Sequence, residues 1–281
     1  SRLAALCLFL LHCQLAVVPC AIGDSCNPLS ISLLFQSPAR APQLTGIVLG
    51  ASASIDLHRP DGSFQAALFP GEAPEIVSAD QQNREIYWSS AASLYLRRGA
   101  FSGGGVTNVI SGYNVGGGVL DNTTNLLYFT DNTAGTVYRA ERDGSSPVLL
   151  GTPGDSPQAP FVWGSYLYFP RKDALFWLDS EEVTVAAPGN MFIAIPDPLG
   201  RQIFYSIAAS GVFVSGTEPG AVPVYLTGSG TPFGIAIDPY TGHLFYREGA
   251  ILYRCSIRGD ECISLHSGLT GSGIALQFDR P

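Results

Sequence analysis

Pairs of adjacent large apolar side chains recur along the chain at a nearly constant interval. The pairs are Ile47-Val48, Tyr87-Trp88, Tyr128-Phe129, Tyr168-Phe169, Phe204-Tyr205 and Phe245-Tyr246. Their second members lie 40, 41, 40, 36 and 41 residues apart, and the segments between them have no helical periodicity. This spacing indicates six copies of one repeated unit.

Each copy divides into four short apolar runs separated by turn residues. In the last copy the runs are residues 234–237, 243–247, 251–256 and 262–265. The first run of a copy is rich in Gly and Ala, which suits strands that crowd around an axis. The pattern predicts an all-β chain that folds as a six-bladed β-propeller of four-stranded antiparallel blades over residues 44–281.

Two arrangements would close such a ring. Residues 273–279 resemble residues 233–238 and would supply the inner strand of the first blade, so that the two ends of the propeller pair. Alternatively, residues 31–35 fill that place and the C-terminal strand begins a further unit. We favour the first arrangement, because the register of a repeated Asp fits it and residues 36–43 have the composition of a loop.

The N-terminus has the layout of a secretory signal peptide. Arg2 precedes an apolar run, and the small residues Ala21 and Gly23 stand before Asp24, where cleavage is expected. Residues 1–23 are therefore a predicted signal peptide and residues 24–43 an N-terminal extension, with a buried strand or a signal anchor as the alternatives. No other segment has the run of about eighteen apolar residues that a membrane span needs. We expect a secreted or extracellular chain without a membrane span in the given sequence, and a fragment of a membrane receptor is one form that such a chain could take.

The cysteines agree with an oxidising compartment. Cys255 and Cys262 flank a turn at equal distances from its centre, so antiparallel pairing would place them opposite each other and favour a disulfide. Cys26 is left without a mate in the mature chain. The turn itself contains Arg258-Gly259-Asp260, which matches an integrin-recognition tripeptide, and a plain hairpin turn is the alternative.

Charge narrows the classes of partner. The net charge is -8 and no basic stripe is present, which disfavours nucleic acid. Asn122-Thr123-Thr124 is a glycosylation sequon in a polar turn, so Asn122 is a predicted glycosylation site.

The third copy resembles a known repeat. Tyr128-Phe129-Thr130-Asp131, preceded by Asp121 and followed by Asp143-Gly144, is similar to the YWTD repeat, the class B repeat of low-density lipoprotein receptors; Tyr87-Trp88-Ser89-Ser90 is a partial match. The resemblance covers about residues 44–281. It implies an extracellular six-bladed propeller that binds a protein partner on one face without catalysis, as in endocytic, laminin-binding or Wnt co-receptor relatives. Only one copy keeps Thr-Asp, and the segment 232–239 is also similar to the entry strand of NHL-type propellers.

Two sets of residues are candidates for function. The loops on one face carry the predicted partner-binding residues Glu75, Tyr113, Asp131, Phe161, Arg171, Lys172, Phe192, Phe233, Arg247 and Glu248. For the aromatic members of this set, the alternative is that they fill gaps between blades. The repeated carboxylates Asp80, Asp121, Asp197 and Asp238 are expected to accept hydrogen bonds from turn N–H groups rather than to act in catalysis.

An enzyme is the competing interpretation. No Gly-x-Ser-x-Gly nucleophile motif occurs, and the expectation is a non-catalytic chain without cofactor or metal. The alternative is a calcium-dependent lactonase or esterase of the six-bladed type, with Glu75, Asn114 and Asn190 as the oxygen ligands at the propeller axis.

Overall fold

All regular structure in the described part of the chain is antiparallel β-sheet. The computed structural model describes residues 40–90, 93–154, 156–163, 166–171, 174–179, 181–186, 191–197, 202–216 and 221–279. The predicted signal peptide, Cys26 and Lys172 lie outside these residues. The strands form six four-stranded sheets, which we number by their order in the chain.

Each sheet is given from its inner to its outer strand. Sheet 1 comprises β24 (Ile274–Phe278), β1 (Leu44–Gly50), β2 (Ser54–His58) and β3 (Phe64–Pro70). Sheet 2 comprises β4 (Ile76–Asp80), β5 (Glu85–Ser90), β6 (Ser93–Ala100) and β7 (Thr107–Ser111). Sheet 3 comprises β8 (Val115–Asp121), β9 (Leu126–Asp131), β10 (Thr136–Glu141) and β11 (Val148–Gly151). Sheet 4 comprises β12 (Phe161–Trp163), β13 (Tyr166–Pro170), β14 (Ala174–Asp179) and β15 (Glu181–Ala186). Sheet 5 comprises β16 (Met191–Pro196), β17 (Gln202–Ile207), β18 (Gly211–Gly216) and β19 (Val224–Thr227). Sheet 6 comprises β20 (Pro232–Asp238), β21 (His243–Glu248), β22 (Ile251–Ser256) and β23 (Ile263–Ser267).

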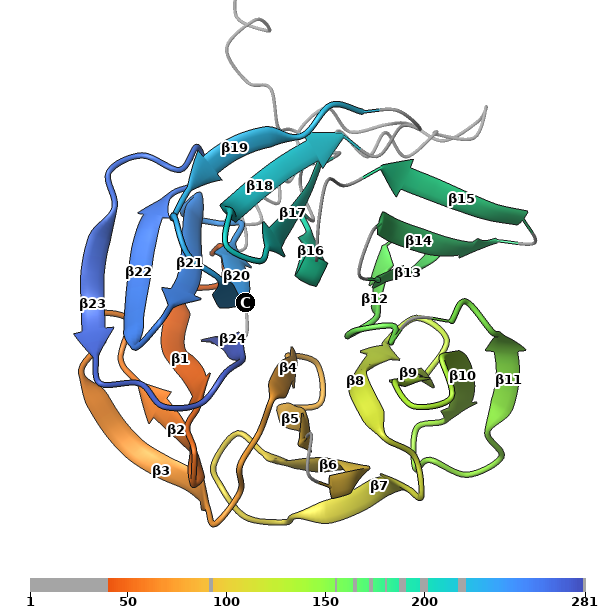
Figure 1. Cartoon of the computed structure of the whole chain (residues 1–281). Helices are drawn as coiled ribbons and strands as arrows, with labels where there is room; N and C mark the ends of the chain where they lie inside the picture. The colour runs from red at the N-terminus through yellow and green to blue at the C-terminus, as the bar shows by residue number, and fades with distance from the viewer. Residues whose placement is uncertain are drawn as a thin grey trace, which may run out of the picture. The chain divides into compact units, whose positions relative to one another are not determined.

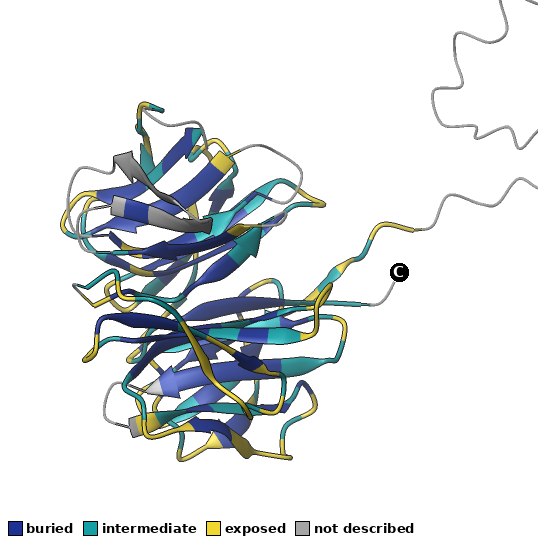
Figure 2. Cartoon of the chain, turned by 90° about the vertical axis from the view of Figure 1, so that its right-hand side faces the viewer, coloured by how far each residue is buried: buried dark blue, intermediate teal, exposed yellow. Residues whose placement is uncertain are grey.

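The sheets stand around a common centre with their first strands innermost (Figure 1). Inner strands of successive sheets contact each other, and β20 of sheet 6 contacts β24 of sheet 1. Buried positions lie on the strands, while the connecting turns are the more exposed parts (Figure 2). The prediction of an all-β propeller with four-stranded antiparallel blades is confirmed.

The ring is closed by pairing of its two ends. Strand β24 pairs with β1, with Ala275 opposite Val48, and thereby supplies the inner strand of sheet 1. Beyond the strands, the Asp279 N–H donates to the Gln43 carbonyl at 3.0 Å. The favoured closure is therefore confirmed: strand pairing between the two terminal segments of the propeller closes the ring.

Adjacent members of each recurring pair pack on opposite sides of their sheet, and all of them are buried except the half-buried Tyr128. In β5, Tyr87 packs with Leu120 and Phe129 of sheet 3, whereas its neighbour Trp88 packs with Val48 of sheet 1. Both are about 1% exposed. Successive strand residues point to opposite faces, so one dipeptide fills the interfaces with both neighbouring sheets. Each buried aromatic side chain contributes roughly 2–3 kcal/mol through the apolar area that it removes from water.

The first copy is registered one residue later than the sequence predicts. Val48 packs toward sheet 2 and Leu49 toward sheet 6, so Val48-Leu49 occupies the place of Tyr87-Trp88, and Ile47 comes one residue before the pair. Because three consecutive residues are apolar here, the sequence does not show which two of them form the pair. The same register places Gln277 where sheet 6 has Asp238, so the repeated Asp that favoured this closure is absent from sheet 1.

Glycines in the turns between third and fourth strands bring neighbouring sheets together. Gly144 has φ +85°, and a Cβ there would overlap the carbonyl oxygen of Val109 in sheet 2. Equivalent close approaches to the outer strand of the preceding sheet occur at Gly62, Gly103 and Gly259. Only glycine combines this backbone conformation with so close a contact.

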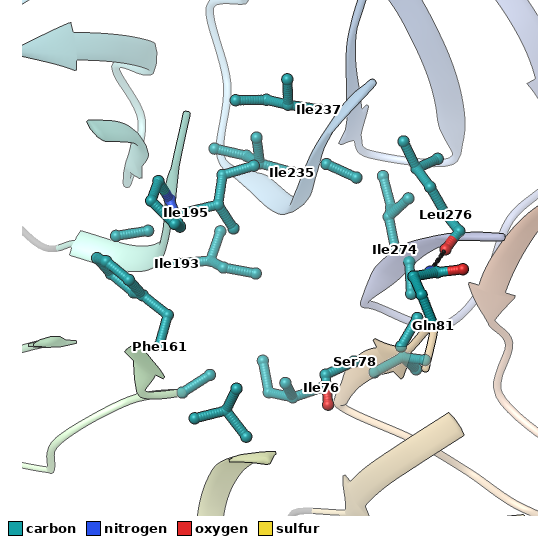
Figure 3. A pocket seen from close by; sticks show the side chains of 18 of the residues that line it. Ile76, Ser78, Gln81, Phe161, Ile193, Ile195, Ile235, Ile237, Ile274 and Leu276 are labelled. Atoms are coloured by element: carbon teal, nitrogen blue, oxygen red, sulfur yellow. Dashed lines mark hydrogen bonds between the residues drawn. The ribbon is translucent and has the colours of Figure 1, made fainter. Parts of the chain in front are cut away.

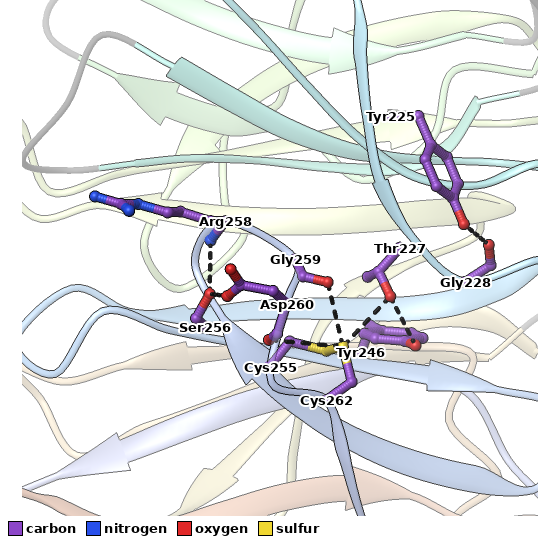
Figure 4. The surroundings of a disulfide bond; sticks show 10 residues. All are labelled: Tyr225, Thr227, Gly228, Tyr246, Cys255, Ser256, Arg258, Gly259, Asp260 and Cys262. Atoms are coloured by element: carbon purple, nitrogen blue, oxygen red, sulfur yellow. Dashed lines mark hydrogen bonds between the residues drawn. A yellow bond between two sulfur atoms is a disulfide. The ribbon is translucent and has the colours of Figure 1, made fainter.

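The hairpin between β22 and β23 carries the predicted disulfide. Cys255 and Cys262 are bonded, and Figure 4 places Arg258, Gly259 and Asp260 at the tip of the loop that they close. A Cβ on Gly259 would lie 2.7 Å from the Leu226 carbonyl oxygen, so the middle residue of the tripeptide rests against sheet 5. The Asp260 carboxylate accepts a hydrogen bond from the Ser256 hydroxyl. The tripeptide thus has a structural role in the turn.

Substitution at Gly144 tests the inter-sheet contact. We expect Gly144→Ala to lose about 3 kcal/mol of unfolding free energy, from backbone strain and from overlap with Val109. Gly112→Ala is the matched control, because Gly112 has φ +86° but a Cβ added there would meet no atom within 4 Å. Its loss should be only about 1–2 kcal/mol. Urea unfolding of both variants measures the difference, and equal losses would contradict the contact.

A buried histidine lies where sheets 1 and 6 meet. His58 of β2 is 2% exposed, and its Nδ1 lies 3.0 Å from the Gly62 carbonyl oxygen. The ring of His266 from β23 lies edge-on to it, with 4.6 Å between ring centres. Burial lowers the pKa of His58 and outweighs the hydrogen bond with the Gly62 carbonyl, which raises it. Smaller effects come from the charge of His266, which lowers the pKa, and from the Asp56 carboxylate, which raises it.

The lowered pKa of His58 predicts that acidification weakens the fold. The neutral ring is favoured in the folded state, so its contribution is complete above the unfolded pKa of about 6.5 and is lost as the pH falls through the lower folded value. We expect the unfolding free energy to decrease between pH 7.5 and pH 5, and to decrease less in His58→Gln. His243→Gln, at the start of β21 in sheet 6, is the control that should keep the wild-type slope. Thermal unfolding across this pH range would contradict the role of His58 if all three slopes agreed.

Candidate binding face

One end of the propeller gathers the loops that enter the inner strands and those that leave the second strands. The register pairs Pro232 at the start of β20 with Glu248 at the end of β21, and Val115 of β8 with Asp131 of β9. Antiparallel pairing therefore brings the two groups of predicted residues to the same end of each sheet. We call this end the entry face.

Two phenylalanines meet on the entry face. Phe192 of β16 and Phe233 of β20 contact edge to face, with 5.9 Å between ring centres. They remain 36% and 39% exposed, so neither simply fills a gap between sheets. Phe161, in contrast, is 7% exposed and stacks on Tyr168, as expected of a residue that fills such a gap. The structure thus separates the aromatic candidates into an exposed pair and a core residue.

Arg247 is buried beside this exposed pair. Its guanidinium carbon lies 5.8 Å from the centre of the Phe233 ring, and the residue is only 7% exposed. Its Nη2 donates a long hydrogen bond of 3.5 Å to the Leu269 carbonyl oxygen, and among the described residues its Nε has no partner. No ion pair reaches this guanidinium within the residues that the structure describes. Burial lowers the pKa of Arg247, but an arginine keeps its charge.

Glu248, next in the chain, does not neutralise Arg247. Its carboxylate accepts hydrogen bonds from the backbone N–H groups of Ser229 at 3.1 Å and Gly230 at 2.5 Å. It also accepts one from the Ser229 hydroxyl at 3.2 Å. Glu248 therefore fixes the loop before β20, and this loop leads directly to Phe233.

Most of the other predicted face residues also have internal roles. Asp131 accepts hydrogen bonds from the N–H groups of Thr133 and Ala134. Arg171 donates to the Pro153 carbonyl at 2.6 Å, and Tyr113 packs edge to face on Phe129.

Glu75 differs from these residues. Its backbone groups are hydrogen-bonded to Ser89 and Ser272, but these contacts do not involve its carboxylate. Desolvation by the surrounding protein raises the pKa of this carboxyl group.

The repeated carboxylates lie at the opposite end of the inner strands. Asp238 accepts from the N–H groups of Tyr240 and Thr241, Asp80 from that of Asn83, and Asp121 from that of Thr123. Asp197 is 8% exposed at the corresponding end of β16. Three of the four therefore stabilise turns directly.

Asn122 lies in one of these turns. Its side chain is exposed, and its Nδ2 lies 3.3 Å from Asp80 Oδ1. Glycosylation there stays a prediction.

Among the described residues, the oxygen atoms near the axis do not form a suitable set of ligands for a calcium ion. Asn190 lies outside the described residues, and the Asn114 amide donates to Thr133 Oγ1 at the edge of the entry face. The cavity on the axis is lined mainly by hydrocarbon side chains, and its polar side chains Ser78 and Gln81 are hydrogen-bonded to backbone groups. Calcium requires six to eight oxygen ligands, which the described part of this lining does not supply.

The sequence singled out Phe192, Phe233 and Arg247 separately, but it did not indicate that they form one cluster. Phe192 and Phe233 belong to successive copies of the repeat, and only the closeness of sheets 5 and 6 brings them together. The equivalent position of the two residues, each second in its inner strand, is the signal that could have predicted the contact.

Comparisons with known proteins identify the fold and no closer relationship. A chain in the crystal structure of the nidogen/laminin complex matches with a TM-score of 0.70 and 17% identity, over 82% of this chain and 97% of that chain. TolB from Acinetobacter baumannii matches with a TM-score of 0.67 and 13% identity, over 83% of this chain and 66% of that chain. No family model and no curated protein matches. At these identities the likeness defines the class of fold, a β-propeller, and nothing finer.

Within the described residues, the structure contains no helix whose length and apolar character would let it cross a membrane.

Replacing Arg247 tests whether its buried positive charge lacks a counter-ion within the protein. Because a buried cation without a counter-ion is costly, we expect Arg247→Met to leave the unfolding free energy unchanged or to raise it by about 1–3 kcal/mol. Arg97→Met is the control, since Arg97 pairs with Glu72 at 2.5 Å and lies 4.0 Å from the Tyr95 ring centre. It should lose about 1 kcal/mol. A large loss in Arg247→Met, measured by urea unfolding, would mean that the charge is compensated.

Proposed function

We propose that the chain is a non-catalytic, extracellular protein-binding propeller whose six sheets act as the six blades of one rigid ring. The observation that carries the proposal is the cluster of Phe192, Phe233 and Arg247, which we call the aromatic–arginine cluster. Exposed aromatic side chains beside arginine are typical of the residues that dominate protein interfaces. A rigid ring presents them with little loss of conformational entropy on binding.

The cluster favours a partner with an acidic side chain. A carboxylate arriving beside Phe233 would meet the Arg247 guanidinium, which has spare donors and, within the described residues, no internal counter-ion. The rings would cover the pair from water, which strengthens the attraction between the charges. The partner would thus supply the ionic contact that the described part of the chain leaves unmade.

Two further observations support the compartment and the mode of action. The Cys255–Cys262 disulfide is typical of proteins outside the reducing cytosol. One of the similar structures was determined as a complex of two proteins, nidogen and laminin. A role resembling that of the low-density lipoprotein receptor class B propellers is consistent with both.

Selection of peptides from a random displayed library tests the proposal. We expect the folded chain to enrich peptides that place an acidic residue beside an apolar one. Their dissociation constants should rise about thirtyfold in Phe233→Ser and in Arg247→Met, which is the loss typical of a hot spot. Phe64→Ser is the matched control, because Phe64 is 54% exposed on the outer strand β3. Enriched peptides that bind all variants equally would refute the assignment of the face.

The lactonase alternative has its own decisive measurement. Calorimetric titration with calcium, followed by a screen of lactones and aryl esters, should give neither binding nor turnover. Turnover that depends on calcium and disappears in Glu75→Gln would replace the binding function with a hydrolase.

A further inference from the structure

A cavity of about 350 Å³ lies on the axis of the propeller. Its walls come from the inner strands, and Figure 3 shows side chains of these strands surrounding an open centre. Isoleucine dominates this lining: the six isoleucines are Ile76, Ile193, Ile195, Ile235, Ile237 and Ile274. Cavities of this volume fall within the range of about 300–1,000 Å³ that is typical of small-molecule sites.

The lining favours an apolar occupant. Ser78 Oγ donates to the Gly118 carbonyl at 3.0 Å. The Gln81 side chain donates to the Leu276 carbonyl at 2.5 Å and accepts from the Phe278 N–H at 3.1 Å. These polar side chains are thus already paired, which leaves mainly the free edges of the inner strands to hydrogen-bond a guest. For comparison, an apolar cavity of about 150 Å³ can stay dry and bind benzene.

The cavity reaches the end of the ring opposite the entry face. Tyr240, which follows β20, lines it and is 47% exposed. Its ring contacts Phe278 of β24 edge to face at 5.4 Å. The aromatic–arginine cluster belongs to the starts of the inner strands, whereas Tyr240 and Phe278 belong to their ends. The lining runs from the strand starts at Ile76, Phe161 and Ile274 to Tyr240, and the mouth at Tyr240 lies at the end of the ring opposite the proposed protein-binding face.

The charged residues near this mouth disfavour apolar ligands that carry a negative charge. The repeated carboxylates Asp80, Asp121, Asp197 and Asp238 all lie at the same ends of the inner strands as Tyr240. Arg84, in the turn after β4, lies at this end too and donates to the Phe278 carbonyl at 2.5 Å, so the carboxylates outnumber this cation. A ligand with an anionic head would meet their repulsion, whereas a neutral hydroxyl could hydrogen-bond the Tyr240 phenol or a strand edge. The lining and the mouth together indicate a hydrocarbon body with an uncharged polar end.

We propose that the axial cavity binds a neutral aliphatic molecule that carries a hydroxyl group and enters from the Tyr240 end. The hydrocarbon chain lies among the isoleucines, and the hydroxyl lies near the mouth. This site takes a small molecule and is independent of the proposed protein-binding function.

The isoleucine methyl groups provide the test. In a protein labelled at the isoleucine δ1 methyls, titration with 1-decanol should shift the six isoleucines of the lining. The blade-core isoleucines Ile47, Ile55, Ile86 and Ile203, each 0% exposed, should remain in place. Decanoate, with the same chain and a negative charge, should bind about tenfold more weakly. Absence of shifts up to the solubility limit of decanol, or equal shifts in both groups of methyls, would overturn the proposal.

A variant that fills the cavity separates binding on the axis from binding elsewhere. Ile237 is half-buried, so the larger side chain of Ile237→Phe should occupy the cavity and abolish the decanol shifts. Ile263→Phe, at a 46% exposed position on β23, is the matched control and should bind normally. Far-UV circular dichroism and thermal unfolding establish that both variants fold. If Ile237→Phe fails to fold, Ile195→Phe provides the same test from sheet 5. Undiminished shifts in a folded cavity-filling variant would also overturn the proposal.

Discussion

The structure depends on burying two consecutive side chains of each second strand on opposite sides of the sheet. A single strand such as β5 places Tyr87 against sheet 3 and Trp88 against sheet 1, so sheet 2 has no core that it completes alone. Its apolar faces are removed from water only when both neighbours are present. Stability of any one sheet is therefore a property of the ring, and the ring requires closure. The pairing of β24 with β1 provides it by joining two segments more than two hundred residues apart.

Close approach of the sheets sets a second requirement, which the turn glycines meet. Gly62, Gly103, Gly144 and Gly259 each bring the backbone of one turn against the outer strand of the preceding sheet. A side chain at any of them would push two sheets apart at their outer edge. This explains why Arg258-Gly259-Asp260 has glycine at its centre without any reference to an adhesion receptor. The disulfide of the same hairpin then fixes a turn that the neighbouring sheet already positions.

The sequence carries the architecture because the architecture is repetitive. Pairs of adjacent large apolar residues at a nearly constant interval predicted the repeat, and the apolar runs between turn residues predicted its four strands. The similarity of residues 273–279 to residues 233–238 predicted the closing strand. The prediction of the pair Ile47-Val48 in the first copy was wrong by one residue. Ile47, Val48 and Leu49 are all apolar and buried, so the residue types do not show which of them face the same side of the sheet. The candidate binding residues were harder to predict for a different reason. Burial of Arg247 and exposure of Phe192 depend on contacts between neighbouring sheets, which no single copy of the repeat encodes.

The two ends of the axis have opposite chemistry, and this follows from the direction of the inner strands. All inner strands run in the same direction along the axis. Residues at the starts of these strands therefore lie together at one end of the axis, and residues at their last positions lie together at the other. Phenylalanines at the second position of β16 and β20 consequently meet beside a buried cation. Aspartates at the final positions of β4, β8 and β20 lie at the other end. In the two proposals, a protein partner with an acidic side chain would be attracted to the first end, and uncharged molecules would enter a hydrocarbon-lined cavity from the second. A ring of repeated sheets could in this way carry two unrelated binding sites, because each end of the axis is built from different positions of the same repeat.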